Sequence, residues 1–313
     1  MISLVIPVYN EEANLPSLAS RLSSAAASWS EPFEVVFVDD GSSDRSLEML
    51  KGLHSRDQRF RYISLTRNFG HQAAVSAGLY HTRGDVVAIM DADLQDPPEI
   101  LEKFIGKLSE GNDVVYAIRQ KRKENALKRL AYWAFYRILS RLSSIRIPLD
   151  SGDFCVMTRR VVNLLNEMPE RNRFVRGLRS WVGFKQVGLA YERDARHAGE
   201  VKFTFKKLIH LALDGLISFT YRPLRLIGIF GLFVSFVSVI GLVLFFLFAA
   251  FDVPILGHSP RDVPGFTSLT LAVLMIGGVQ LLSLWIIGEY IGRIFDEVKR
   301  RPLFLVKESS PPG

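Results

Sequence analysis

The sequence has very little cysteine and lacks an amino-terminal leader pattern. Cys155 is the single cysteine among 313 residues, so an intrachain disulfide is excluded, and it fits no metal-ligand spacing. The opening run MISLVIPVYN has neither the basic region nor the long apolar stretch of a signal peptide. We therefore expect the first domain to stay in a reducing, cytoplasmic compartment, and we interpret Cys155 as a small buried residue.

Charged residues are missing from two long segments near the C-terminus, 226–251 and 266–288. Each segment exceeds the ~20 residues that a helix needs to cross a bilayer, so both are predicted to be transmembrane helices. Their flanks are basic, whereas the segment between them holds a single Lys or Arg, which predicts cytoplasmic termini. Neither span has an ionisable residue in its middle, which argues against transport. Gly277 and Gly278 leave room for close helix approach in a homo-oligomer, and the alternative is that these glycines are merely tolerated.

A glycine-rich G-x-G-x-x-G turn is also missing, because Pro7-Val8-Tyr9-Asn10-Glu11 follows the first apolar run. A dehydrogenase loses its main support here, since that turn binds the pyrophosphate of a dinucleotide. Phosphates, if bound, must be held by a metal ion.

Short apolar runs alternate with helix-like segments through the first half of the chain. Strands are predicted at 2–8, 33–38, 60–65, 85–90 and 113–118, which indicates βαβ units and a mostly parallel sheet. Ser43 and Asp44 are candidate caps for the helix that follows, and Pro97 and Pro98 suit the first turn of another. The fold class is therefore α/β, and ligands are expected beyond the carboxyl ends of the strands.

The net charge of +7 and the pI of about 9.5 favour an anionic partner, which charge alone does not identify. Basic residues gather on two segments with helical apolar spacing, 126–142 and 205–217. Such amphipathic helices suit a membrane surface. For 126–142, a helix packed on the sheet with a solvated basic face is an equal alternative.

Two acidic clusters follow predicted strands. In Asp91-Ala92-Asp93-Leu94-Gln95-Asp96, the side chains of Asp93 and Gln95 would point the same way if the strand persists. Hard oxygen donors that leave sites open suit Mg²⁺ or Mn²⁺ carrying a diphosphate. A solvated acidic turn or a helix cap is the simpler alternative. Asp39-Asp40 ends another strand, where a carboxylate accepts hydrogen bonds from a base or a ribose.

Four motifs together resemble a known family. SLVIPVYNEEANL, VVFVDDGSSD, RNFGHQAA and MDADLQDPPE occur in the order seen in the inverting family 2 glycosyltransferases of GT-A fold. Within that family the chain is similar to the polyprenyl-phosphate glycosyltransferases, which include dolichyl-phosphate mannose synthases and bacterial bactoprenol glucosyltransferases. The two apolar segments resemble the bacterial glucosyltransferase branch. The resemblance covers roughly residues 1–220.

The resemblance implies a role for individual residues. The residues that it places at the nucleotide-sugar are Pro7, Tyr9, Glu11, Asp39 and Asp91. Asp93 and Gln95 would hold Mg²⁺ or Mn²⁺, with Asp93 counted as catalytic, and Arg119 and Arg129 would bind the lipid phosphate. Asp153 would be a catalytic acceptor-side residue, either a base or an orienting group. Arg196 and Lys202 would belong to a mobile loop, in which Val201 departs from the usual small polar residue.

The function implied is the transfer of one sugar from a nucleotide-sugar, UDP-glucose being favoured, to undecaprenyl or another polyprenyl phosphate, with inversion. GDP-mannose or a modified pentose donor stays open. Three rivals are a processive polysaccharide synthase, a non-catalytic membrane adaptor and a nucleic-acid-binding protein. The processive synthase is disfavoured because the chain has no Q-x-x-R-W element and only two predicted spans, fewer than such a channel needs. The adaptor is disfavoured because the acidic and glutamine positions in Asp91–Gln95 are all present. The third is disfavoured because the basic residues lie near apolar segments.

The expected organisation has four parts. Residues 1–200 form the cytoplasmic GT-A catalytic domain, and 201–224 form an amphipathic juxtamembrane helix. Residues 225–290 contain two transmembrane helices with a short external loop, and 291–313 form a cytoplasmic tail. The protein is thus expected to be a multi-pass protein of the inner, cytoplasmic membrane.

Overall fold

A computed structural model of the chain describes residues 1–119, 151–171, 173–191 and 266–311, with 229–230, 233, 236 and 240. The amphipathic segments 126–142 and 205–217 lie outside these residues. The chain divides into two compact units, one formed by residues 1–215 with 300–313 and the other by residues 216–299.

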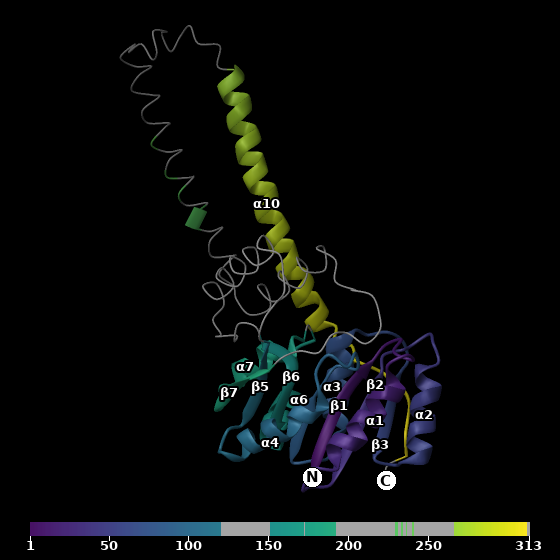
Figure 1. The fold of residues 1–313 in the computed structure, drawn as a ribbon. Coiled ribbons are helices and arrows are strands. Elements are labelled where there is room, and N and C mark those ends of the chain that lie inside the picture. The colour runs from purple at the N-terminus through teal and green to yellow at the C-terminus, as the bar shows by residue number, and fades with distance from the viewer. Residues whose placement is uncertain are drawn as a thin grey trace. The chain divides into compact units, whose positions relative to one another are not determined.

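A mixed eight-stranded sheet forms the centre of the first unit, in the order β7-β5-β6-β4-β1-β2-β3-β8 (Figure 1). Its strands are β1 (Ile2–Val8), β2 (Phe33–Asp39), β3 (Phe60–Leu65), β4 (Val86–Ile89), β5 (Val114–Arg119), β6 (Ser151–Thr158), β7 (Gln186–Tyr191) and β8 (Val306–Ser309). The five predicted strands are confirmed as β1 to β5. Strands β6 and β8 run antiparallel to their neighbours.

Helices cover both faces of this sheet (Figure 1). They are α1 (Leu15–Ala26), α2 (Ser46–Arg56), α3 (His71–His81), η1 (Pro98–Ile100), α4 (Leu101–Ser109), α6 (Arg159–Glu167) and α7 (Val175–Val182). Pro98 begins η1 as predicted, and the Asp44 carboxylate accepts a hydrogen bond from the first backbone N–H of α2, at 2.9 Å.

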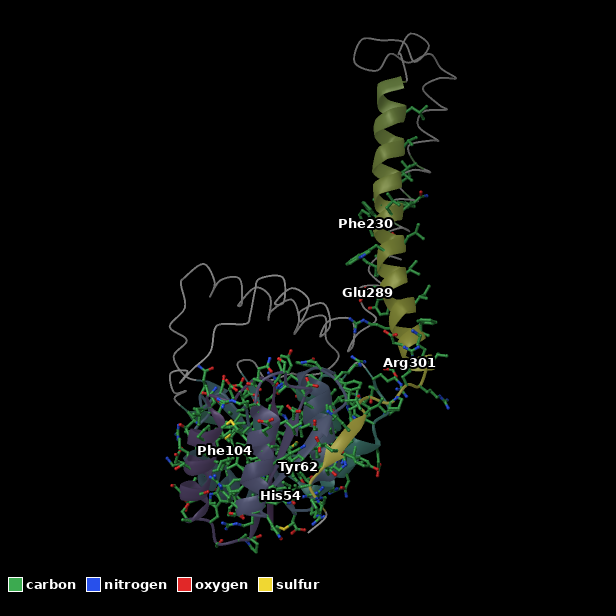
Figure 2. The ribbon with its side chains drawn as sticks, turned by 90° about the vertical axis from the view of Figure 1, so that its right-hand side faces the viewer. His54, Tyr62, Phe104, Phe230, Glu289 and Arg301 are labelled. Atoms are coloured by element: carbon green, nitrogen blue, oxygen red, sulfur yellow. The ribbon has the colours of Figure 1, made fainter. Side chains whose placement is uncertain are left out.

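The alternation of side chains along the strands divides the core between the two faces. Val35 and Phe37 of β2 belong to a large cluster with α1, α2 and α4, whereas Val36 and Val38 pack with α3. In the large cluster Phe104, labelled in Figure 2, stacks on Phe154 of β6 with ring centroids 5.1 Å apart. Strand β1 is buried along its whole length, as expected of a central strand covered on both faces.

The C-terminal strand β8 was not predicted. It pairs antiparallel with β3 (Figure 2). Just after the end of β8, Ser310 donates its N–H to the Tyr62 carbonyl, and the Tyr62 N–H donates to Ser310 Oγ. Lys51 of α2 binds Glu308 at 2.8 Å. Phe304 packs against the α3-side cluster beside Phe69. Residues from the far end of the chain therefore form the edge strand of this sheet.

The second unit contains α10 (Phe266–Val298), a helix of 33 residues that includes the second predicted span. Its last turns are charged, with ion pairs between Glu289 and Arg293 and between Asp296 and Lys299. Within the part of the chain that the structure describes, no helix reaches the length and hydropathy required to cross a membrane.

We expect Phe304→Ala to destabilise the first unit by about 1–3 kcal/mol, because Phe304 is a partly buried ring that covers the α3-side cluster. The measurement is thermal unfolding of the purified full-length protein. Leu305→Ala is the matched control, since the Leu305 side chain is 50% exposed and only its carbonyl binds Thr66. Equal melting temperatures for both variants and the wild type would show that the tail is not part of this core.

Candidate active site

The carboxyl ends of β1, β2 and β4 lie at one edge of the sheet, because these strands are parallel. Since β6 runs the other way, its amino end lies at the same edge. Ile89 pairs with Cys155, so Asp91, two residues beyond the end of β4, comes level with Asp153, two residues before Cys155 in β6. The sheet thus brings the predicted donor-side and acceptor-side carboxylates together.

The loops after β1 and β2 are fastened to each other by side chains. Asn10, in the left-handed region with φ 55°, donates its N–H to Ser42 Oγ at 3.0 Å, and its side-chain oxygen accepts the Ser43 N–H at 2.8 Å. Glu11 donates its N–H to Ser46 Oγ, and its carboxylate accepts from Asn14 at 2.6 Å. The predicted residue Glu11 is therefore fixed by both loops.

Pro7 lies in β1 near its end, and Tyr9 follows directly after the strand. Pro7 is buried and pairs with Val38 of β2. Because the pairing of β1 with β4 ends at Val5, the N–H that Pro7 lacks is not needed for a hydrogen bond to β4. The Tyr9 ring is exposed. Of these two predicted residues, Tyr9 is the one whose side chain is exposed to solvent.

Asp39 and Asp40 are both buried and both bind the protein itself. Asp39 accepts hydrogen bonds from the Ser42 N–H at 3.1 Å and from Ser64 Oγ at 3.0 Å. Asp40 accepts the N–H groups of Phe69 and Gly70 at 2.7 and 2.9 Å. The pair therefore shapes the turn after β2 and holds the loop that leads into α3.

The metal-candidate residues lie in a turn, and the alternation expected of a continuing strand does not apply, because β4 ends at Ile89. Leu94 is buried with φ 57°, a conformation that costs ~1–3 kcal/mol in a residue other than glycine. Through this turn the Gln95 N–H reaches the Asp93 carboxylate at 3.2 Å. Strain held at such a place is typical of functional sites.

Asp93 and Gln95 fit a hard divalent cation by the chemistry of their donors, one carboxylate and one amide oxygen in the same turn. Among the described residues no group of three His, Cys, Asp or Glu side chains surrounds a common point. The pair would therefore leave most coordination positions to substrate oxygens and water. Beneath the turn, the hydroxyl of Tyr191 donates to the buried Asp96.

Asp153 is held by three side chains from two helices. His71 Nε2, at the start of α3, lies 3.3 Å from one carboxylate oxygen and 3.9 Å from the nearer oxygen of Asp91. Gln72 donates to the same Asp153 oxygen at 3.4 Å. Arg176 of α7 binds the other oxygen through Nε and a terminal nitrogen, at 3.3 and 3.2 Å.

The remaining predicted residues are placed only in part. Arg119 is the last residue of β5, at the same edge of the sheet. Arg129, Arg196 and Lys202 lie outside the described residues. Cys155 is fully buried, as predicted, and burial raises the pKa of its thiol.

Comparison with known proteins identifies the family. Residues 3–165 match the model of "Glycosyl transferase family 2". The chain belongs to glycosyl transferase family 2.

Several curated relatives of this glycosyltransferase align over almost its whole length. "Uncharacterized glycosyltransferase YkcC" of Bacillus subtilis is 43% identical, over 98% of this chain and 93% of that protein. "SfII prophage-derived bactoprenol glucosyl transferase" of Shigella flexneri is 40% identical, over 98% of each chain. The "Prophage bactoprenol glucosyl transferase homolog" of Escherichia coli is 39% identical, over 98% of each. Among solved structures, mannosyl-3-phosphoglycerate synthase from Rubrobacter xylanophilus has a TM-score of 0.47 and 20% identity, over 73% of this chain and 75% of that one.

The electrostatics of the glycosyltransferase separate its two carboxylates. Burial raises the pKa of Asp91 to about 6; nearby carboxylates add to this, whereas His71 opposes it. Burial acts the same way on Asp153, but the Arg176 guanidinium and the His71 hydrogen bond outweigh it and hold that pKa well below its usual range. Burial would lower the pKa of His71, yet the Asp153 hydrogen bond and the two carboxylate charges raise it to about 9. At neutral pH Asp153 is thus a permanent anion between two cations.

Sequence reasoning missed His71, Gln72, Arg176 and Arg179. The RNFGHQAA motif contained the first two and served only to indicate the family, although an imidazole and an amide beside a flexible glycine were a usable signal. Arg176 and Arg179 had no such signal, because only the packing of α7 against β6 reveals them.

We expect Gly41→Ala to destabilise the protein by about 1–3 kcal/mol and to lower its activity. Gly41 has φ +68°, and a Cβ there would lie 2.6 Å from the backbone carbon of Arg67 and 2.7 Å from the nitrogen of Asn68. The loop that donates to Asp40 would have to move. Thermal unfolding and initial rates measure both effects.

Gly52→Ala is the matched control for that prediction. Gly52 lies inside α2, where an added Cβ meets nothing within 4 Å, so the substitution should be neutral or should stabilise by up to ~1 kcal/mol. If Gly41→Ala unfolded and reacted like Gly52→Ala, the close approach of the two loops would not be required.

Proposed function

We propose that this family 2 glycosyltransferase moves one sugar from a nucleotide-sugar to a polyprenyl phosphate, with inversion at the anomeric carbon. The observation that carries the proposal is the facing pair of carboxylates, Asp91 on the donor side and Asp153 on the acceptor side, bridged by His71. The relatives whose names state bactoprenol glucosyl transfer, at about 40% identity over 98% of each chain, supply the substrate class.

The donor is UDP-glucose on this proposal. Glucose follows from the names of the same relatives, and the uridine nucleotide from the resemblance to the bacterial branch. Tyr9 offers an exposed ring at the end of β1, and the loops fixed by Glu11 and Asp39 shape the surface beside it. GDP-mannose is the donor to compare in the same assay.

The reaction is an in-line displacement. A phosphate oxygen of the acceptor attacks the anomeric carbon, the bond from that carbon to the nucleoside diphosphate breaks, and the electron pair leaves with the diphosphate. Mg²⁺ or Mn²⁺, when bound, neutralises the charge that develops on the leaving group. Asp93 and Gln95 would hold it, and the buried Leu94 keeps these two donors in one turn.

Asp153 acts as an orienting anion in this mechanism. Its pKa lies well below the usual range because Arg176 and His71 stabilise the charged form, so it is a poor acceptor for a proton. A base is not required, since a phosphate monoester has its second pKa at ~6 and is largely dianionic at neutral pH. Asp153 instead fixes the two cations that flank it.

Asp93→Asn should raise the barrier to sugar transfer by several kcal/mol at saturating Mg²⁺ or Mn²⁺, which lowers the rate on the order of 100-fold or more. The assay incubates the purified protein with radiolabelled UDP-glucose or GDP-mannose and undecaprenyl phosphate, with and without EDTA, and identifies the lipid product. Asp85→Asn is the control, because that carboxylate lies at the opposite end of β4 with its side chain 84% exposed. Normal transfer by Asp93→Asn would remove Asp93 from the metal site, and products longer than one sugar would favour a processive synthase.

The same proposal includes a membrane hairpin formed by 226–251 and 266–288, with the catalytic unit and the tail on the cytoplasmic side. Neither segment contains a charge. Apolar side chains of α10, including Leu269, Leu281 and Trp285, are more than half exposed and need a cover such as lipid. The residues before and after the two segments belong to one unit, because β8 pairs with β3 in the same sheet as β1. Both flanks of the hairpin are therefore expected on one side of the membrane, as an even number of crossings requires.

Cysteine labelling tests this topology, and the buried Cys155 keeps the background low. In spheroplasts, Ser259→Cys in the loop between the spans should react with a membrane-impermeant maleimide. Lys307→Cys, at an exposed position of β8, should react only after lysis. Labelling of both positions, or of neither, in intact spheroplasts would contradict the hairpin.

A further inference from the structure

Helix α7 directs two arginines one turn apart, Arg176 and Arg179, at strand β6. The helix is fixed at its start because the Val175 N–H donates to the side-chain oxygen of Gln72, at 2.8 Å. Gln72 also binds Asp153, so α3, α7 and β6 meet at this point. The assigned donor site does not use either arginine.

Arg176 is held on one side and accessible on the other. Its Nε and one terminal nitrogen bind Asp153, and among the described residues the other terminal nitrogen has no hydrogen-bond partner. The side chain is 22% exposed. An arginine anchored by a carboxylate along one edge presents its remaining N–H groups in a fixed direction, as recognition of a phosphate requires.

Arg179 supplies an independent observation. It is 1% exposed, and its Nε and one terminal nitrogen have no hydrogen-bond partner. Its guanidinium lies over the Tyr116 ring at 5.4 Å, and its charge helps to lower the pKa of Asp153. Burial of a cation is costly; the Asp153 charge offsets part of that cost, and a second anion nearby would offset more of it.

His71 completes the cationic side of this cluster. Its imidazole is 41% exposed, lies 3.3 Å from Asp153, and bridges towards Asp91. The three cations His71, Arg176 and Arg179 face two carboxylates, those of Asp153 and Asp91. The Asp153 charge is already shared by His71 and Arg176, so positive charge remains on the exposed side of the cluster.

We infer that Arg176 and His71, with Arg179 behind them, bind the phosphate group of the acceptor. The inference rests on the proposed function and deepens it, because it assigns a phosphate site on α7 and α3 beyond the arginines Arg119 and Arg129. Asp153 is the positioning residue that holds the two exposed cations. The site lies beside Asp91, so a phosphate there is next to the donor side of the sheet edge.

The test measures phosphate binding without metal and without turnover. Dimethylallyl phosphate, inorganic phosphate and UDP are titrated into the purified full-length protein in EDTA by calorimetry. For Arg176→Gln we expect dimethylallyl phosphate to bind about tenfold more weakly, as loss of a charge-assisted hydrogen bond implies, with UDP affinity unchanged. Arg176→Lys should keep part of the affinity. Arg160→Gln is the control, because Arg160 stacks on Phe184 outside the site.

Each outcome decides the inference. Weaker UDP binding with unchanged dimethylallyl phosphate binding would assign Arg176 to the donor, and no change in either would remove the site. If Arg176→Gln loses both ligands, His71→Gln decides: selective loss of dimethylallyl phosphate supports the site, and any other result overturns it. If the binding pattern holds while undecaprenyl phosphate receives no sugar, the proposed function fails and the phosphate site stands.

Discussion

The antiparallel pairing of β6 with β4 is the constraint on which the site depends. Its register sets Cys155 beside Ile89 and thereby brings Asp153 level with Asp91. A slip of one residue would turn Asp153 to the other face of the sheet, away from α3 and α7. The parallel strands alone would bring only the predicted donor-side residues to the edge, and it is the reversed strand that adds Asp153, the predicted acceptor-side carboxylate.

Next to that pairing, helices α3 and α7 stabilise the buried carboxylate of Asp153. A buried carboxylate is unfavourable unless it is paired, and Asp153 receives His71 and Gln72 from α3 and Arg176 from α7. The loop that starts α3 is in turn held by Asp40 and, through Thr66, by the backbone of Leu305. A continuous set of contacts therefore joins the returning C-terminal tail to the first residue of α3.

Much of the fold could be predicted because buried parallel strands are continuous apolar runs, and β1 to β5 are such runs. Two of the strands that were not predicted, β7 and β8, escaped for a physical reason. QVGLAY and VKES are short and only partly buried, and they become strands through partners far away in the sequence. Residues 291–313 were predicted only as a cytoplasmic tail, whereas in the structure Glu308 binds Lys51 of α2 and Phe304 packs against the α3-side cluster.

The site could be predicted where a motif follows a strand and not where packing makes the contact. Asp91 and Asp93 follow β4 at the expected edge, whereas Asp153 lies in β6, a strand that was not predicted, and was indicated only by the family resemblance. The hydrogen bonds of Asp39 could not be predicted, since only the structure shows that one of its oxygens accepts from the Ser42 N–H and the other from Ser64 Oγ. Whether Asp153 is a base or an orienting group also depended on Arg176, which α7 brings from another part of the chain.

Asp153 is a fixed anion between two cations, His71 and Arg176. NMR titration of histidine-labelled protein in EDTA tests it most directly, with His71→Gln used to assign the resonance. We expect His71 to titrate near pH 9, because Asp153 and Asp91 stabilise its protonated form, and we expect Asp153→Asn to move its pKa down towards the ordinary value. A His71 pKa at or below about 6.5 in the wild-type protein would contradict the account.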